Sequence, residues 1–184
     1  MVVLESLLQL EKFFAIKEEI GLKDATLYLN VSAHTIMHPK FCSIFTDFVE
    51  KHKLGSNQFG LEVTETAELE DINVASESLS FLKSKGIKIA LDDFGAGYSA
   101  LRYLKDLPVD VLKLDKSFTS ELQENHNQSL FQIAKLMADS LAMEFICEGL
   151  EEQWQIEKAI NLGCEIGQGF YLHRPCSLED LNNE

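Results

Sequence analysis

The sequence predicts an α/β fold in which helices cover a parallel sheet of six strands. Three observations predict it. Short runs rich in β-branched and aromatic residues alternate with longer amphipathic stretches. The Gly-rich phosphate-binding motif of an open dinucleotide-binding sheet does not follow the first strand. A polar side chain also stands at the end of each predicted strand, as at the catalytic face of a (β/α) barrel. An open doubly wound sheet and a barrel are the two architectures in competition.

The predicted elements alternate from one end of the chain to the other. Residues 1–20 carry apolar side chains at helical spacing, and Gly21 ends this helix. Gly86 ends the helix before the third strand, and Pro108 precedes the fourth strand. Strands are predicted at 27–31, 59–63, 87–91, 109–114, 144–147 and 164–168. Helices are predicted between them at 39–53, 71–85, 98–105, 128–141 and 152–162.

Length and charge limit the domain count and the partners. The 184 residues suit a single domain over 1–184, with a leading helix in 1–26 and the barrel elements in 27–184. A net charge of −14 argues against a nucleic-acid polymer or an anionic membrane as the main partner. A small phosphorylated ligand remains possible if a cation lies between it and the protein.

The lack of a recognisable targeting signal and the pattern of cysteines predict a cytoplasmic protein. No run approaches the roughly 18 apolar residues of a membrane span, and the start lacks the basic region of a secretory signal. The four cysteines form no C-x-x-C pair, and Cys147 and Cys164 lie in apolar runs. We therefore expect buried thiols in a reducing compartment.

Polar side chains at six successive strand ends form the candidate site. They are Asn30, Glu62, Asp92 with Asp93, Lys113 with Asp115, Glu148, and Gln168. In a barrel these ends converge on one face. Five crowded carboxylates repel one another unless a cation offsets them. Since no histidine or cysteine is among them, Mg²⁺ or Mn²⁺ is favoured over Zn²⁺. Two such ions form the clamp used for in-line attack on a phosphodiester, and Lys113 could orient the attacking water.

Each residue taken alone also has a plainer role. Asp92 or Asp93 could cap a turn or a helix, and Glu62 could be a rim charge beside Glu65. Lys113 could pair with Asp115 on one strand face, or act as a base on a carbonyl acid in an enolase-like site. The coincidence of polar groups at six strand ends favours a shared phosphodiester site.

Six motifs carry a resemblance to a known family. They are Asn-Val-Ser-Ala at 30–33, Glu-Val-Thr-Glu at 62–65, Asp-Asp-Phe-Gly-Ala-Gly-Tyr-Ser at 92–99, Lys-Leu-Asp at 113–115, Glu-Gly-Leu-Glu at 148–151 and Gln-Gly-Phe at 168–170. With these motifs the sequence resembles the EAL-domain family, the cyclic-di-GMP phosphodiesterases of bacteria. The resemblance runs in order from about residue 27 to the end, and the family fold is a modified TIM-type barrel.

The resemblance implies a role for each matching residue. One metal ion would be bound by Asn30, Glu62 and Asp92, and a second by Asp92, Asp93 and Asp115. Lys113 would contact the attacking water, and Glu148 would be the general base. Substrate or loop support is implied for Glu65, Gly95, Gly97, Glu151 and Gln168. The loop containing Gly95 and Gly97 would link metal binding to dimerisation, and glycines there permit turns with positive φ.

One departure from the family lies at the front of the chain. The sequence contains no Glu-Ala-Leu, the motif whose glutamate completes the metal site and whose neighbouring arginine contacts substrate in the family. Six strands and 184 residues, against about 250 for a complete barrel, predict an incomplete TIM-type (β/α) barrel with about six of eight strands.

Two functions follow from this combination. One is Mg²⁺- or Mn²⁺-dependent hydrolysis of cyclic di-GMP to the linear dinucleotide. The other is a catalytically inactive module that binds cyclic di-GMP or a protein, because the first-strand glutamate and the arginine are missing. Exposed sheet edges predict a homodimer or other self-association, and a sensor or GGDEF domain is a candidate partner.

Overall fold

The computed structural model describes residues 2–17, 21–22, 25–64, 69, 71–97 and 100–181. Its strands are β1 (Leu27–Val31), β2 (Phe59–Thr64), β3 (Lys88–Phe94), β4 (Val111–Leu114), β5 (Glu144–Cys147) and β6 (Ile166–Gly167). Its helices are α1 (Val2–Ile16), α2 (Ala33–Ile36), α3 (Phe41–His52), α4 (Ile72–Ser84), α5 (Ala100–Asp106), α6 (Lys116–Ser120), α7 (Asn125–Ser140), α8 (Gln153–Asn161) and α9 (Leu178–Leu181).

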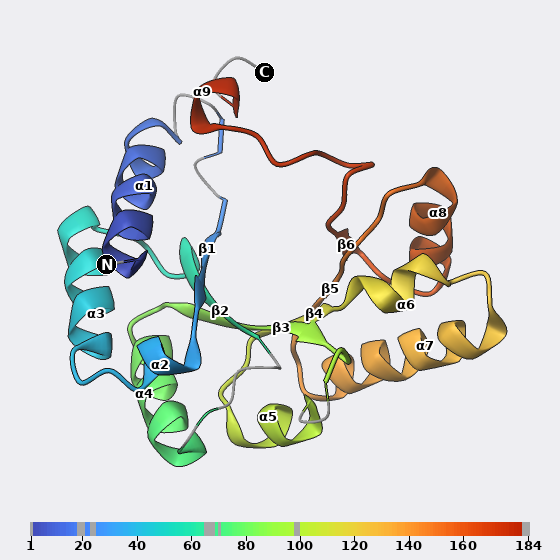
Figure 1. Ribbon diagram of the computed structural model, residues 1–184, viewed down its shortest axis with the longest axis horizontal. Helices are drawn as coiled ribbons and strands as arrows, with labels where there is room; N and C mark the ends of the chain where they lie inside the picture. The colour runs from blue at the N-terminus through green and yellow to red at the C-terminus, as the bar shows by residue number, and fades with distance from the viewer. Residues whose placement is uncertain are drawn as a thin grey trace.

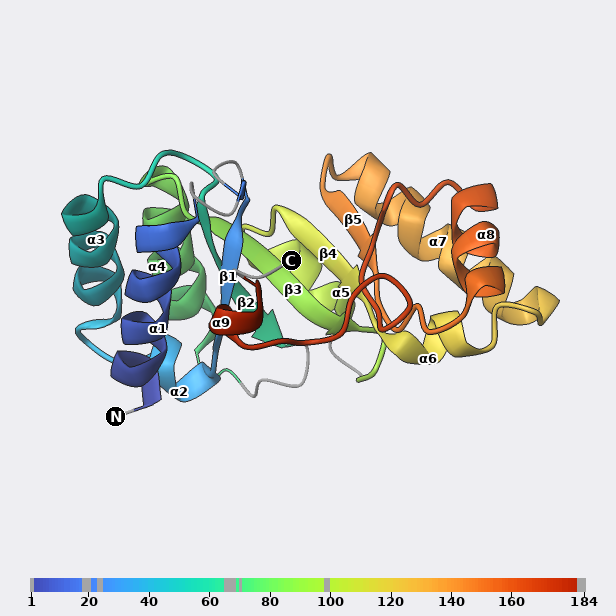
Figure 2. The same cartoon turned by 90° about the horizontal axis from the view of Figure 1, so that it is seen from above.

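The six strands form one parallel sheet in chain order, β1-β2-β3-β4-β5-β6. The sheet curves into an arc, and the longer helices lie on its convex side (Figure 1). Within the described residues, β1 pairs only with β2 and β6 only with β5, so the arc does not close. The segment after β6 runs across this open side toward α9, on the β1 side (Figure 2). These features confirm the predicted incomplete barrel.

The core lies between the convex face of the sheet and the helices. Side chains alternate between the two faces of a strand, so Leu61, Ile89 and Leu112 point outward, and all three are fully buried. Phe45 of α3 and Phe131 of α7 are buried in the same hydrophobic cluster. The alternate positions of each strand therefore face the concave side of the arc, which is the interior of the incomplete barrel.

The third strand contains an irregularity that the sequence did not reveal. The pairing of β3 with β4 runs from Leu91 opposite Leu112 to Phe94 opposite Leu114. Asp92 and Asp93 therefore share a single opposing residue, Lys113, which is the count of a β-bulge. Asp93 has φ of +55°, a left-handed conformation that few residues other than glycine adopt. The strand also extends three residues beyond its predicted end at Leu91.

The sequence analysis missed three one-turn helices and misplaced one helix start. Helices α2, α6 and α9 have four or five residues each, too few to produce a hydrophobic period. Helix α7 begins at Asn125 rather than at 128, because its first turn is polar. None of the described helices is long and apolar enough to cross a membrane.

Candidate active site

A buried lysine stands at the centre of the concave face. Lys113 on β4 places Nζ 3.0 Å from Glu62 Oε1, 2.8 Å from Asp92 Oδ1 and 2.7 Å from Glu148 Oε1. The four side chains are only 5%, 11%, 13% and 15% exposed, in the order Lys113, Glu62, Asp92, Glu148. Lys113 therefore joins carboxylates from β2, from β3 and from the residue after β5. Within the described part of the chain, Lys113 forms no ion pair with Asp115.

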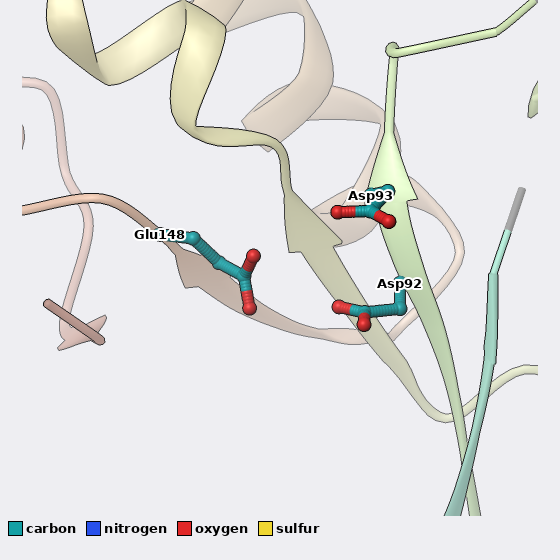
Figure 3. Close-up of side chains that lie close together, drawn as sticks. All are labelled: Asp92, Asp93 and Glu148. Carbon is teal, nitrogen blue, oxygen red and sulfur yellow. The ribbon is translucent and has the colours of Figure 1, made fainter. Parts of the chain in front are cut away.

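The bulge in β3 brings a further carboxylate to the same place. In a regular strand, consecutive side chains point to opposite faces. Here Asp92, Asp93 and Glu148 each offer one carboxylate oxygen within 4.8 Å of the others. Figure 3 shows both aspartate side chains directed from β3 toward Glu148. The Asp-Asp dipeptide thus delivers two carboxylates to one site because the strand is irregular there.

The electrostatics of the site favour protonation or a bound cation. Burial raises the pKa of Glu62 and of Glu148, and the negative charge of Asp92 adds to both shifts while Lys113 opposes them. Burial followed by repulsion from Asp92 raises the pKa of Asp93. Burial alone would lower the pKa of Lys113, but its contacts with Asp92 and Glu148 raise it overall, so this side chain stays an ammonium.

The donor set suits a hard divalent cation. The Lys113 ammonium contacts three carboxylates, and Asp93 adds a fourth beside Asp92 and Glu148, so the site retains excess negative charge. Asp92 Oδ1 is buried and accepts no hydrogen bond from the described residues, although Lys113 lies within ion-pair distance. Besides the ammonium, this oxygen has a lone pair with which it could bind a metal ion. Carboxylate oxygens without histidine or cysteine match Mg²⁺ or Mn²⁺.

Two further predicted metal ligands border the group formed by Glu62, Asp92, Asp93 and Glu148. Asp115 caps α6, where its Oδ1 accepts a hydrogen bond from Ser117 N at 3.0 Å. The negative charge of Asp115 still acts on the site, since its repulsion contributes to the raised pKa of Asp93. Asn30 is exposed on the edge strand, in register with Glu62. A metal-binding role for Asn30 and Asp115 stays a prediction.

The predicted support residues are spread around the rim. Gln168 and Glu151 are exposed, and Gln168 N donates to Cys147 O at 2.9 Å. Gly95 has φ of +95° in the loop after β3, and Gly97 ends the described part of that loop. Glu65 lies outside the described residues.

Sequence reasoning missed a buried network that holds the loop after Glu148. Gln155 is 5% exposed. Its Oε1 accepts from Glu151 N at 2.7 Å and from Glu152 N at 2.8 Å, and its Nε2 donates to Thr119 O at 3.2 Å. The fully buried Thr119 hydroxyl donates to the Glu148 carbonyl. A sequence signal existed: Glu152 and Gln155 form a capping box at the start of α8.

Gly169 fixes the position of the same loop from the other side. A Cβ at this residue would lie 2.1 Å from Leu150 O and 2.3 Å from Leu150 N. Because these are backbone atoms, we expect Gly169→Ala to lower the free energy of unfolding by about 1–3 kcal/mol, as in overpacked cores. Urea denaturation measures the change.

Gly55→Ala is the matched control for this substitution. A Cβ at Gly55 would meet nothing nearer than Gln58 Cδ at 3.7 Å. We therefore expect a change within about 0.5 kcal/mol. Equal losses in the two variants would contradict the steric argument.

Comparisons with known proteins place these features in a family context. The family model "EAL domain" matches residues 2–175. The cyclic di-GMP phosphodiesterase PdeA of Borreliella burgdorferi is 34% identical over 148 residues, which are 80% of this chain and 22% of PdeA. The bifunctional diguanylate cyclase/cyclic di-GMP phosphodiesterase MucR of Pseudomonas aeruginosa is 33% identical over 162 residues, 88% of this chain and 24% of MucR. The chain spans only 20% to 26% of the length of the first curated relatives it matches.

Solved structures share the architecture. The MucR phosphodiesterase in complex with c-di-GMP has a TM-score of 0.82 at 31% identity, covering 96% of this chain and 70% of that chain. A manganese/cy-diGMP complex of BlrP1 from Klebsiella pneumoniae has a TM-score of 0.81 at 27% identity, covering 92% of this chain and 44% of that chain.

Proposed function

The chain belongs to the EAL domain family, and from this premise we propose that it is a bacterial signalling domain that hydrolyses cyclic di-GMP to the linear dinucleotide with Mg²⁺ or Mn²⁺. The observation that carries the proposal is the position of Lys113 Nζ, within 3.0 Å of carboxylates from three strand ends. The similarity to PdeA, a cyclic di-GMP phosphodiesterase, supports the activity, and the manganese complex of BlrP1 supports the choice of metal.

The proposed roles are those that the family resemblance implies, and the geometry of the side chains supports them. Glu62, Asp92 and Asp93 would hold the divalent ions, and Asn30 and Asp115 are further candidate ligands. Such ions supply charge neutralisation to the phosphodiester and acidify bound water. Glu148 accepts the proton of the water that attacks phosphorus, while the bond from phosphorus to the leaving sugar oxygen breaks and opens the ring. The Lys113 ammonium orients that water and offsets the charge developing on the phosphate.

A second candidate is binding of cyclic di-GMP without turnover. The open side of the sheet favours it, since within the described strands nothing pairs with the outer edge of β1. In that case the carboxylate and arginine expected from a first strand would be missing, and metal affinity would fall.

One experiment separates the two candidates. The chain is incubated with cyclic di-GMP and Mn²⁺ or Mg²⁺, and the products are resolved by chromatography, with EDTA as the metal-free control. We expect metal-dependent linear product. Binding by calorimetry without product would support the second candidate, and neither binding nor product would contradict both.

We further propose that the chain self-associates in the cytoplasm and works with a sensor or GGDEF domain. The support is that β1 and β6 each leave one edge open among the described strands, together with the similarity to MucR, a bifunctional diguanylate cyclase/cyclic di-GMP phosphodiesterase. Sedimentation velocity at several concentrations tests the self-association, and a monomer throughout would contradict it.

A further inference from the structure

Two cysteines that are distant in the sequence meet behind the site. Cys147 is the last residue of β5, and Cys164 lies just before β6. Their Sγ atoms are 3.2 Å apart. Both residues are buried, at 1% and 6% exposure, and both are free thiols. The 17-residue separation matches no dithiol motif, so only the fold reveals the pair.

The two thiols lie on one face of β5, and the carboxylates of the site (Glu62, Asp92, Asp93 and Glu148) lie on the other. Cys147 directly precedes Glu148, and side chains alternate along a strand. Cys147 O also accepts the hydrogen bond from Gln168 N at 2.9 Å. In the sheet, Cys147 pairs with Gly167 of β6. A covalent bond between the two sulfurs would therefore join the segments that carry Glu148 and Gln168.

We propose that Cys147 and Cys164 form a reversible oxidation site, which hydrogen peroxide converts into an intramolecular disulfide. The geometry carries the proposal, because the sulfurs need approach by only about 1 Å to reach the bond length of about 2.05 Å.

The chemistry balances with a peroxide as oxidant. The Cys164 sulfur attacks one peroxide oxygen, the O–O bond breaks, and a sulfenic acid and one water form. The Cys147 sulfur then attacks the sulfenic sulfur, the S–O bond breaks, and a second water leaves. Two thiols are oxidised to one disulfide, and one peroxide is reduced to two waters. The interaction with Cys147 lowers the pKa of the Cys164 thiol, which favours Cys164 as the sulfur that attacks first.

A small oxidant can reach the pair through the sheet edge. Strand β6 has only two residues, and of the described strands it pairs with β5 alone. Ile166 within it is 39% exposed. Short edge strands open at low cost in free energy, so opening of β6 would uncover the thiols without global unfolding.

The test uses the whole chain treated with a slight excess of hydrogen peroxide. Mass spectrometry is expected to show a loss of two hydrogens, with the link mapped to the peptides that contain Cys147 and Cys164. The midpoint of thermal unfolding should rise by roughly 5 °C, because the bond restricts the unfolded chain. Dithiothreitol should reverse both changes.

Cysteine variants test whether the disulfide forms between Cys147 and Cys164 rather than between other cysteines. The double variant Cys42→Ser with Cys176→Ser should keep both changes, because Cys42 and Cys176 lie outside the dithiol. Cys164→Ser should lose both, and the mapped link in the double variant decides the question if Cys164→Ser does not fold. Links to Cys42 or Cys176 would overturn the proposal, as would equal formation of the bond in urea-unfolded chain.

Discussion

Glu148→Gln is expected to abolish hydrolysis of cyclic di-GMP while ligand binding survives. The amide has nearly the shape of the carboxylate, so it can keep the contact with Lys113 Nζ, now at 2.7 Å. It cannot accept the proton of the attacking water. Loss of a general base costs about 10²–10⁴ in rate. Turnover is measured by chromatography with Mn²⁺, and affinity by calorimetry, where we expect a change of less than about threefold.

Glu144→Gln is the control for this variant. Glu144 begins the same strand, at the end remote from the carboxylate cluster, and it pairs with Lys88 at 2.9 Å. We expect its turnover to stay at the wild-type rate. If Glu148→Gln hydrolyses cyclic di-GMP at the wild-type rate, Glu148 is not the general base. Loss of binding together with turnover would instead assign Glu148 to ligand or metal binding.

Lys113→Met is expected to cause a large loss of stability. The substitution leaves Glu62, Asp92, Asp93 and Glu148 without their buried cation. Breaking a buried ion pair by removing one partner costs about 3–5 kcal/mol. Urea denaturation at neutral pH without divalent ions measures the free energy of unfolding, and added Mg²⁺ or Mn²⁺ should restore part of it.

The pH dependence of this variant has a definite sign. Without Lys113, the pKa values of Glu62 and Glu148 rise further above their ordinary value of 4.5. The folded state then binds protons more tightly than the unfolded state, so stability is lost as the pH rises through the folded pKa values. The deficit relative to wild type should therefore shrink as the pH falls from neutral toward 4.5.

Lys88→Met is the matched control for Lys113→Met. Lys88 is 23% exposed and contacts one carboxylate, that of Glu144. Exposed pairs contribute about 0–1 kcal/mol, so the expected loss is small. Equal losses in the two variants, or a Lys113→Met deficit that stays constant in acid, would contradict the role of Lys113 as a central cation.

Strand order and the family were accessible from the sequence because they depend on local patterns. Alternating apolar runs predicted six strands, and the sheet has them in chain order. The motifs around Glu62, Asp92 and Glu148 indicated the family that the domain match establishes. Short helices were missed, since α2 and α6 depend on the capping side chains of Ser32 and Asp115 rather than on periodicity.

The sequence by itself determined the six strands, the longer helices and the polar side chains near the strand ends, because the hydrophobic periods of helices and strands can be read from neighbouring residues. Only the tertiary structure decided which of those side chains come into contact with one another. The bulge turned Asp92 and Asp93 to one face, Asp115 became a helix cap, and Cys147 met Cys164. Each outcome depends on the register with a neighbouring segment or on local backbone geometry, and a pattern along one strand contains neither.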